Sequence, residues 1–493
     1  MIQIGSRREL FWDDYLIDTE KTTAETRLGT FTRRGAVAVF DKPWEKQGAG
    51  YFTVFYDEAY KGGIYRLYYK ALSTEYSDTE TRIAYMESPD GINWERPSLG
   101  LCEFQGSRDN NLIIMRNMPG MPPVLDNFQV FVDDNPNRVV KERYKAVLQY
   151  VPGSGMFDME NPLYLMSYVS DDGLVWRPHE IVTYQGRFDS LNTCHWNREH
   201  GKYFCFIRNF HYPEHKPLEA DPKQINFKKI IRDIRIVESE DFIHWTEPEL
   251  LTYGGAEDIQ LYTNGITPYY RAPHILTGFP TRYTERREWT RNYDRLCGAE
   301  MRKKKCAIEP RLGLAITDCL FMCSRDGHTW LRPDEAILRP DPEREINWIY
   351  GDCYPAVGMI ETPGEYEGED SEISMYTGAG QWRETPCFLM RRTIRKDGFM
   401  LRHAGGRQEK IVTKVFSYEG ERMLLNFATS GRGYIHITLR DTETGAEIHS
   451  DEIFGNRTDR QIDFDGEVKA FSLRPVIMEI EMRDADVYSF KFE

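Results

Sequence analysis

The chain has 493 residues, which is enough for two or three domains, and hydrophobic residues make up 40% of it, so a sizeable core can form. The formal net charge is −15, and an acidic surface repels phosphate backbones, so we expect no nucleic-acid partner. No run of about 18 apolar residues is present, so we expect no membrane span and no membrane partner.

The N-terminus and the cysteines indicate a compartment. Residues 1–18 contain no apolar region of the kind that signal peptides have, so we expect a cytoplasmic protein. Nine cysteines are scattered without a CxxC pair or a Cys/His ligand spacing, which fits reduced thiols. We therefore expect no metal site and no cofactor. The densest basic run, 301–306, is expected to be a solvated loop.

A short motif recurs along the first four fifths of the chain. The pattern S-x-D-(G/F)-x-x-W occupies 88–94, 170–176, 239–245 and 324–330, with starts 82, 69 and 85 residues apart, and 395–399 holds a degenerate fifth copy. Its Asp accepts backbone hydrogen bonds two residues on, and its Gly adopts positive φ without steric cost, so the motif predicts a turn. We assign these Asp residues a structural role.

Strand-like segments precede each turn, and long amphipathic helical patterns are scarce. Four-stranded units repeated every 70–85 residues are typical of propeller blades. The sequence therefore predicts an all-β fold in which residues 1–402 form a five-bladed β-propeller. The predicted blades are 36–115, 122–182, 186–250, 255–337 and 347–402.

The pattern changes after residue 402. Residues 403–493 contain short alternating strands separated by turn residues, without the repeated motif. This indicates a small C-terminal β-sandwich that packs against the propeller or contacts a sugar.

Carboxylates stand at the start of every predicted blade, where innermost strands line the axis of a propeller. They are Glu45, Asp126, Asp189, Glu257 with Asp258, and Asp352. Glycoside cleavage requires one carboxylic acid to protonate the leaving oxygen and a second carboxylate to act as nucleophile or base. Crowded like charges raise one pKa and so supply the acid at neutral pH.

Cationic and aromatic residues add possible substrate contacts. Four cationic side chains could either form salt bridges between blades or donate hydrogen bonds to sugar hydroxyls, carboxylates or phosphate. They are Arg208, Arg232, Arg271 and His274. Trp382 could stack on a sugar or pack inside its blade.

The sequence resembles five-bladed glycosidases in three features. These are the repeated turns, the PWE stretch before a VFYD strand, and the segment YRLYYKA followed by RIAYMESPDGINWERP. The chain is similar over residues 36–400 to N-terminal-domain-like proteins of glycoside hydrolase family 32, whose scaffold families 43, 68 and 130 share. The family 32 signature WMNDPNG is absent. Asp189 lies in the sequence F-D-S, where that family has R-D-P. Glu257 lies in the sequence A-E-D, where that family has E-C.

The resemblance implies three acting acids, and we predict Glu45 as nucleophile or base, Asp189 as stabiliser or base, and Glu257 as general acid. Asp258 could replace Glu257, because the register is not fixed to one residue. The other predicted substrate-binding residues are Asp126, Arg208, Asp258, Arg271, His274, Asp352 and Trp382.

Three functions remain open from the sequence. The first is an exo-acting glycoside hydrolase that cleaves a terminal sugar from an oligosaccharide or glycoside, with furanosides as the first choice of substrate. The second is a phosphorylase of the family 130 type, with Arg208, Arg232, Arg271 and His274 around phosphate. The third is a non-catalytic glycan-binding propeller. A sialidase fits less well, because sialidases have six blades. The sequence does not indicate an oligomeric state.

Overall fold

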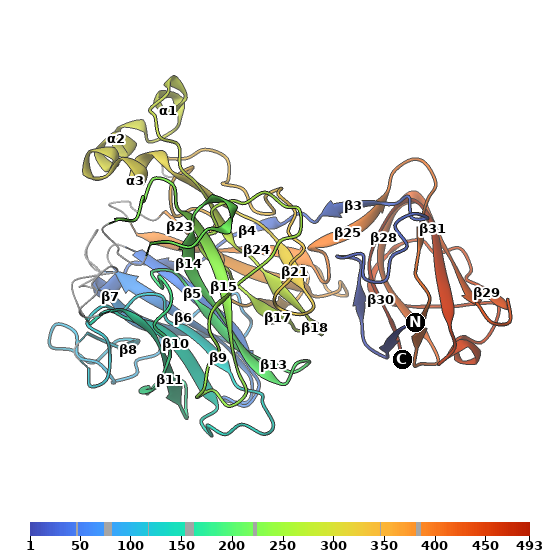
Figure 1. Cartoon of the computed structure of the whole chain (residues 1–493), viewed down its shortest axis with the longest axis horizontal. Coiled ribbons are helices and arrows are strands. Elements are labelled where there is room, and N and C mark those ends of the chain that lie inside the picture. The colour runs from blue at the N-terminus through green and yellow to red at the C-terminus, as the bar shows by residue number, and fades with distance from the viewer. Residues whose placement is uncertain are drawn as a thin grey trace.

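The computed structural model of the chain describes residues 1–45, 48–72, 81–116, 118–152, 162–219, 224–345, 347–380 and 386–493. Its regular secondary structure is mostly β-strand and forms a large β-propeller beside a smaller β domain (Figure 1). Both chain termini lie in the smaller domain (Figure 1). No helix in these ranges is long and apolar enough to cross a membrane.

The first three blades are regular antiparallel four-stranded sheets. Blade one contains β5 (Gly48–Asp57), β6 (Ile64–Leu72), β7 (Thr81–Ser88) and β8 (Leu112–Ile114), preceded by the 3-10 helix η1 (Pro43–Glu45). Blade two contains β9 (Gln129–Val132), β10 (Tyr144–Tyr150), β11 (Tyr164–Ser170) and β12 (Arg177–Thr183). Blade three contains β13 (Thr193–Asn197), β14 (Lys202–His211), β15 (Ile231–Ser239) and β16 (Glu249–Leu250), with the 3-10 helix η3 (Pro213–His215) after β14.

Blade four is interrupted. Its strands are β17 (Thr267–Tyr269), β18 (Ala272–Gly278) and β21 (Met322–Ser324), continued beyond a break by the pair β19 (Thr281–Thr284) and β20 (Ile316–Cys319). Pro280, which has no backbone N–H, lies at the break. A helical insertion follows β19: α1 (Arg291–Arg295), α2 (Ala299–Ile308) and α3 (Pro310–Leu314).

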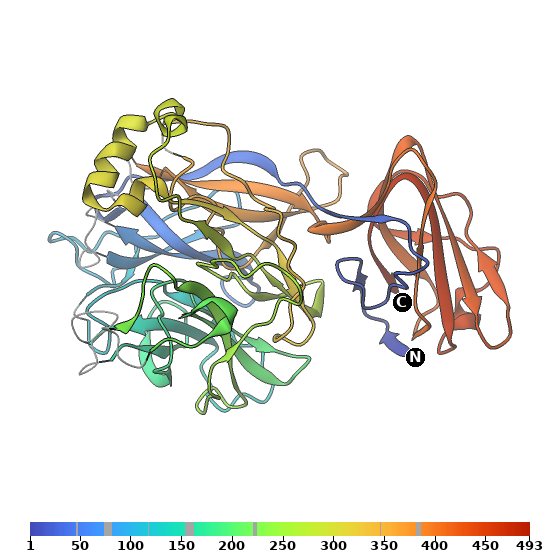
Figure 2. The same ribbon diagram turned by 45° about the horizontal axis from the view of Figure 1, so that its top comes forward.

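The basic run at 301–306 lies in α2 and is not a loop. Arg302 and Lys305 are buried there, and the Arg302 guanidinium donates to the backbone carbonyls of Asn347 and Trp348. The insertion projects from one end of the propeller (Figures 1 and 2).

An N-terminal strand completes blade five. That sheet has the order β22 (Ile360–Thr362), β23 (Glu372–Ala379), β24 (Cys387–Arg395) and β4 (Thr32–Phe40). The innermost strands of neighbouring blades contact one another in four pairs: β5 with β9, β9 with β13, β13 with β17, and β22 with β5. The five-bladed propeller expected from the repeat is confirmed.

The repeated motif forms the predicted turn. Asp90 accepts the backbone N–H groups of Ile92 at 2.8 Å and Asn93 at 2.7 Å. Equivalent pairs of bonds are made by Asp172, Asp241 and Asp326. Burial opposes ionisation of Asp90, but these backbone bonds outweigh it and lower its pKa to about 2. Phe242 adopts the left-handed φ of 66° that glycine adopts in the other copies.

The turns also join the blades. Trp94 of blade one packs edge-on against Tyr376 of blade five at 5.6 Å between ring centroids, and Trp330 of blade four packs against Phe206 of blade three at 5.8 Å. The Tyr68 hydroxyl of blade one donates to the Gly173 carbonyl in the turn of blade two at 3.0 Å. The large aromatic content therefore supplies the core between the sheets.

The smaller domain is one ten-stranded sheet that curls around its own apolar core. Two long strands, β28 (Met423–Asp441) and β31 (Val476–Phe492), pair along most of their length and organise it. Its other elements are β1 (Ile2–Gly5), β2 (Glu9–Leu10), β3 (Glu25–Leu28), β25 (Met400–Ala404), β26 (Glu409–Val412), β27 (Phe416–Tyr418), β29 (Glu447–His449), β30 (Asn456–Ile462) and η5 (Val468–Phe471).

The N-terminal segment therefore crosses between the domains. The sequence analysis placed residues 1–402 in the propeller, whereas β1, β2 and β3 pair with strands of the C-terminal sheet. Only β4 of this segment joins a blade. These pairings link residues almost at opposite ends of the chain, so no local pattern reveals them.

A buried carboxylate, Asp397, holds the two domains together. Its Oδ1 accepts the Tyr269 hydroxyl at 2.6 Å and Arg271 Nε at 2.9 Å. Its Oδ2 accepts the Ser489 hydroxyl at 2.6 Å and Asn426 Nδ2 at 2.9 Å, and lies 3.5 Å from Arg8 Nη1. We call Asp397 and these five partners the interface hub.

Candidate functional site

One residue from the start of each blade contributes to an electrostatically linked group of side chains. Burial raises the pKa of Tyr51 well above its usual value, and Tyr262, Asp126, Tyr350 and Asp189 raise it further. Lys70 Nζ lies 4.9 Å from the Tyr51 ring centroid and 2.6 Å from Asp126 Oδ1. Tyr51 lies in β5, and the other four precede the first strands of blades two to five. We call these five residues the axial cluster.

Aromatic rings form one side of the axial cluster. The Tyr262 ring centroid lies 5.6 Å from that of Tyr350, 5.7 Å from that of Tyr354 and 6.2 Å from that of Tyr283. The Tyr350 hydroxyl donates to the Tyr262 hydroxyl at 2.7 Å. Burial raises the pKa of each of these tyrosines, so their hydroxyls stay protonated and can donate hydrogen bonds.

The two carboxylates of the axial cluster differ in access. Asp126 is buried, and its Oδ1 lies 2.6 Å from Lys70 Nζ. The side chain of Asp189 is 43% exposed, and its Oδ2 lies 3.6 Å from Arg208 Nη2. Asp189 is therefore the carboxylate that a molecule entering from solvent can reach.

Three arginines border the tyrosines. Arg208 Cζ lies 5.5 Å from the Tyr262 ring centroid, Arg232 Cζ lies 4.4 Å from that of Tyr283, and Arg311 Cζ lies 5.4 Å from that of Tyr350. Among the described residues, the buried atoms Arg208 Nη2 and Arg232 Nε have no hydrogen-bond partner. Buried donors normally have partners, so these two are available to a bound group.

Glu45 and Glu257 lie apart from Asp189. Glu45 is fully buried, and its carboxylate accepts Arg96 Nε at 2.9 Å and the Tyr69 hydroxyl. Glu257 is exposed, and its backbone carbonyl accepts a hydrogen bond from Arg332. In the part of the chain that the structure describes, neither side chain contacts the axial cluster.

Four other predicted residues have different surroundings. Arg271 belongs to the interface hub, and His274 Nε2 lies 3.3 Å from Glu9 Oε1 in the N-terminal segment, so both face the smaller domain. Asp352 accepts the backbone N–H of Ile349 at 3.0 Å, and burial raises its pKa to about 6. Trp382 lies outside the described residues.

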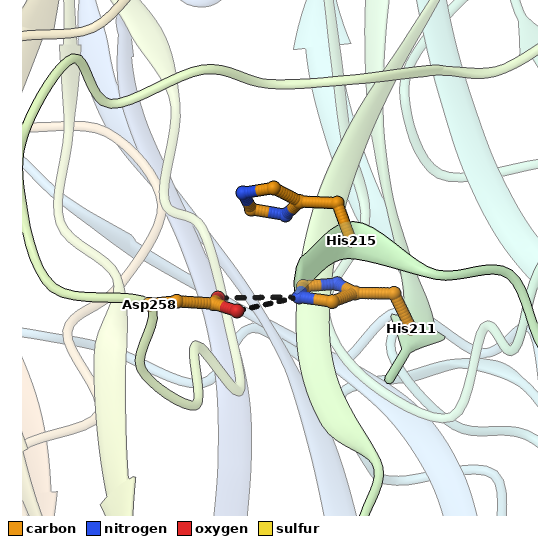
Figure 3. Close-up of side chains that lie close together, drawn as sticks. All are labelled: His211, His215 and Asp258. Carbon is orange, nitrogen blue, oxygen red and sulfur yellow. Dashed lines mark hydrogen bonds and ion pairs between the residues drawn. The ribbon is translucent and has the colours of Figure 1, made fainter. Parts of the chain in front are cut away.

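Asp258 belongs to a second cluster, on blade three and the segment after it. His211 Nε2 lies 3.1 Å from Asp258 Oδ2, and His211 Nδ1 lies 2.9 Å from Asp233 Oδ2. Burial alone lowers the pKa of the His211 imidazole, but the hydrogen bonds with Asp233 and Asp258 outweigh it and raise the pKa above its usual value. Figure 3 shows the His215 ring beside this pair.

The sequence analysis selected Asp126, Asp189 and Arg208, which belong to or border the axial cluster, but did not select the tyrosines. Tyr51, Tyr262 and Tyr350 occupy the same position as the carboxylates at the starts of their own blades, and that shared position was the available signal. The spacing His-x-x-x-His at 211–215 was the signal for the second cluster.

Comparisons with known proteins return only distant structural similarity. No protein-family model matches the sequence, and no match among curated proteins was found. A solved glycoside hydrolase aligns over 74% of this chain and 92% of its own, at 12% identity and a TM-score of 0.44.

Two further solved structures align over more of the chain. A β-fructofuranosidase from Schwanniomyces occidentalis complexed with fructosyl-erythritol aligns over 96% of this chain and 98% of its own, at 11% identity and a TM-score of 0.40. A family 43 arabinoxylan arabinofuranohydrolase from Bacillus subtilis aligns over 91% and 80%, at 9% identity and a TM-score of 0.35. The fold assignment rests on the sheet topology described above, and these similarities add no argument about chemistry.

Proposed function

We propose that this protein is a glycoside hydrolase that acts on a terminal sugar at the axial cluster, with Asp189 as a reacting carboxylate. One observation supports this most: the charges of Asp126 and Asp189, from the starts of neighbouring blades, both raise the pKa of Tyr51, and of these two carboxylates Asp189 is the one that is partly exposed to solvent. Glycosidases place two carboxyl groups on either side of the bond that they break.

The surrounding groups suit a sugar. Protonated tyrosine hydroxyls can donate to sugar hydroxyls, and tyrosine faces can stack on a sugar ring. Asp126, held by Lys70, is suited to bind a substrate hydroxyl or to orient Asp189.

The test is turnover of a panel of nitrophenyl furanosides and pyranosides and of natural oligosaccharides. We expect Asp189→Asn to lower kcat by roughly 10²- to 10⁴-fold, because amide nitrogen and oxygen cannot take over the role of a carboxylate. The matched control is Asp171→Asn, an exposed aspartate in the turn of blade two, which should leave turnover unchanged. Full activity of Asp189→Asn, with unchanged thermal unfolding, would refute the assignment.

A phosphorylase is the second candidate, and the arginines favour it. Among the described residues, Arg208 Nη2 and Arg232 Nε are buried donors without a hydrogen-bond partner, and phosphate accepts such donors strongly. Arg208 Nη2 also lies 3.6 Å from Asp189 Oδ2. Turnover that requires inorganic phosphate and yields a sugar 1-phosphate would support this reaction, whereas equal turnover without phosphate would exclude it. Binding of glycans without any turnover would instead support a non-catalytic glycan-binding propeller.

A further inference from the structure

Two histidines and an aspartate converge on one point outside the axial cluster. The ligand-capable atoms of His211, His215 and Asp258 all lie within 4.8 Å of one another. His211 is the buried end residue of β14, whereas His215 and Asp258 are exposed. The two rings lie on the same side of the Asp258 carboxylate, with centroids 5.0 Å apart (Figure 3).

A second carboxylate fixes the orientation of the buried histidine. Asp233 on β15 lies 2.9 Å from His211 Nδ1, and it also accepts Arg235 Nε and Nη2, each at 3.1 Å. A histidine that donates from one ring nitrogen to a carboxylate presents its other nitrogen as a lone pair, which is the usual arrangement around metal-binding histidines. Here the other nitrogen is Nε2, which faces Asp258.

The backbone brings His215 to the same point at a conformational cost. Glu214 and His215 both adopt left-handed conformations, with φ of 63° and 56°. Non-glycine residues rarely adopt this region, and such strain is often found at functional sites. Beneath this segment the buried side chains of Phe210, Ile225 and Ile230 pack together and anchor it.

We propose that His211, His215 and Asp258 bind a divalent transition metal, with zinc as the first choice, and that Asp233 positions His211 for this purpose. Two imidazoles and one carboxylate are the protein ligands of many zinc sites in which water or substrate occupies the remaining position. The exposed sides of His215 and Asp258 leave that position open to solvent. The sequence analysis expected no metal, because the cysteines form no CxxC pair and no Cys/His ligand spacing. Asp258 lies 47 residues from His211 in the chain, so local spacing does not reveal this site.

A simpler explanation accounts for only part of the geometry. An imidazolium of His211 held between Asp233 and Asp258 would form a buried ion pair and would not require His215. Yet the His215 ring lies against His211 and, within the described residues, has no hydrogen-bonded or ionic partner of its own. The metal proposal gives this ring and its strained backbone a role.

The site lies near the axial cluster. The Leu261 amide, three residues after Asp258, donates to the Arg232 carbonyl at 3.1 Å, and Arg232 Nη1 donates to Gln260 Oε1 at 2.6 Å. Assigning Asp258 to the metal leaves Glu257 as the predicted general acid. Metal binding is measured directly below, so its outcome does not depend on the proposed glycosidase activity.

The experiment compares zinc and cobalt binding by the full chain and four variants after removal of bound metal with a chelator. We expect about one zinc per chain by elemental analysis and visible absorption from bound cobalt. His215→Ala and Asp258→Asn each remove one ligand and should weaken binding more than Asp233→Asn, which should weaken it by roughly 10- to 100-fold.

His244→Ala is the matched control. His244 is an exposed histidine of blade three whose Nδ1 lies 2.7 Å from Asp241 Oδ2, so it forms a similar pair without a third ligand. This variant should bind metal like the unmodified chain. The proposal is overturned if the unmodified chain binds neither metal, or if His215→Ala, with unchanged unfolding in chelator, binds as well as His244→Ala.

Discussion

The axial cluster and the interface hub are both rich in buried arginine, tyrosine and aspartate, but their hydrogen bonding differs. In the hub, Asp397 receives donors from Tyr269, Arg271, Asn426 and Ser489 within 2.9 Å. In and around the axial cluster, Arg208 and Arg232 each retain a buried donor without a partner among the described residues.

This difference concerns the two regions alone, because Arg66 and Arg302 elsewhere in the described residues also have a buried Nε without a hydrogen-bond partner. Burying a polar group without a partner costs free energy, so proteins leave few such groups, and those that remain require an explanation. In the hub the partners come from both domains, and the result is attachment. At the axis a bound molecule would supply the missing partners.

The largest expected effect is at the hub. Asp397→Ala removes the carboxylate between Arg8 and Arg271 and should lower the free energy of unfolding by about 3–5 kcal/mol, because it leaves buried cations uncompensated. Burial opposes ionisation of Asp397, but the two arginines outweigh it, so its pKa is lowered. Its contribution is therefore present above pH 3.8, the usual Asp value, and is lost as the pH falls further. Denaturant unfolding at pH 7 measures the effect, and a cost below about 1 kcal/mol would contradict it.

Asp352 should behave in the opposite way. Burial raises its pKa to about 6, so its ionisation disfavours the fold, and this penalty is absent below pH 3.8 and complete above pH 6. Asp352→Asn should therefore stabilise the protein at pH 8, by at most about 3 kcal/mol, and the gain should disappear at low pH. Unfolding curves at several pH values measure this, and a gain that does not depend on pH would refute the explanation.

The two buried arginines provide a direct contrast between the regions. Arg271→Met removes two hydrogen bonds to Asp397 and should cost about 2 kcal/mol. Arg208→Met removes one hydrogen bond, from Nε to the Arg187 carbonyl at 2.6 Å, and an ion pair at 3.6 Å with the partly exposed Asp189, and should cost about 1 kcal/mol. Paired unfolding measurements decide this, and equal costs would remove the distinction between the regions.

The smallest effect is expected at the tyrosines. Tyr262→Phe deletes the acceptor of the Tyr350 hydroxyl and should cost about 1 kcal/mol. Tyr366→Phe, at an exposed tyrosine, is the control and should change nothing measurable in the same thermal unfolding experiment. A neutral Tyr262→Phe would indicate that the hydroxyl pair does not stabilise the fold.

The sequence predicted the propeller because its signal is local. Each S-x-D-(G/F)-x-x-W turn is built from hydrogen bonds over two or three residues, so Asp90 and Asp326 could be recognised without knowledge of the fold. The helical insertion was missed because a short run of basic residues gives no apolar periodicity, although Arg302 is buried against Asn347.

The candidate site was harder to predict for a physical reason. The sequence places a carboxylate near the start of every blade, but whether that side chain faces the axis depends on partners that are distant in sequence. Glu45 is held by Arg96 and Tyr69, whereas Asp189 remains accessible. Only the three-dimensional arrangement distinguishes two acids that look alike in the sequence.

The strand β4 has a consequence for how the molecule is made. It leaves the ribosome before any other blade strand, yet it can pair only with β24, which is synthesised after the four preceding blades. The segment before β4 can pair only later still, because Glu9 pairs with Phe490 and Leu10 pairs with Ser489 in β31. During synthesis the fifth blade therefore remains incomplete until β24 emerges, and the smaller domain remains incomplete until β31 emerges, so the nascent chain carries unpaired strands from its N-terminal segment during both intervals.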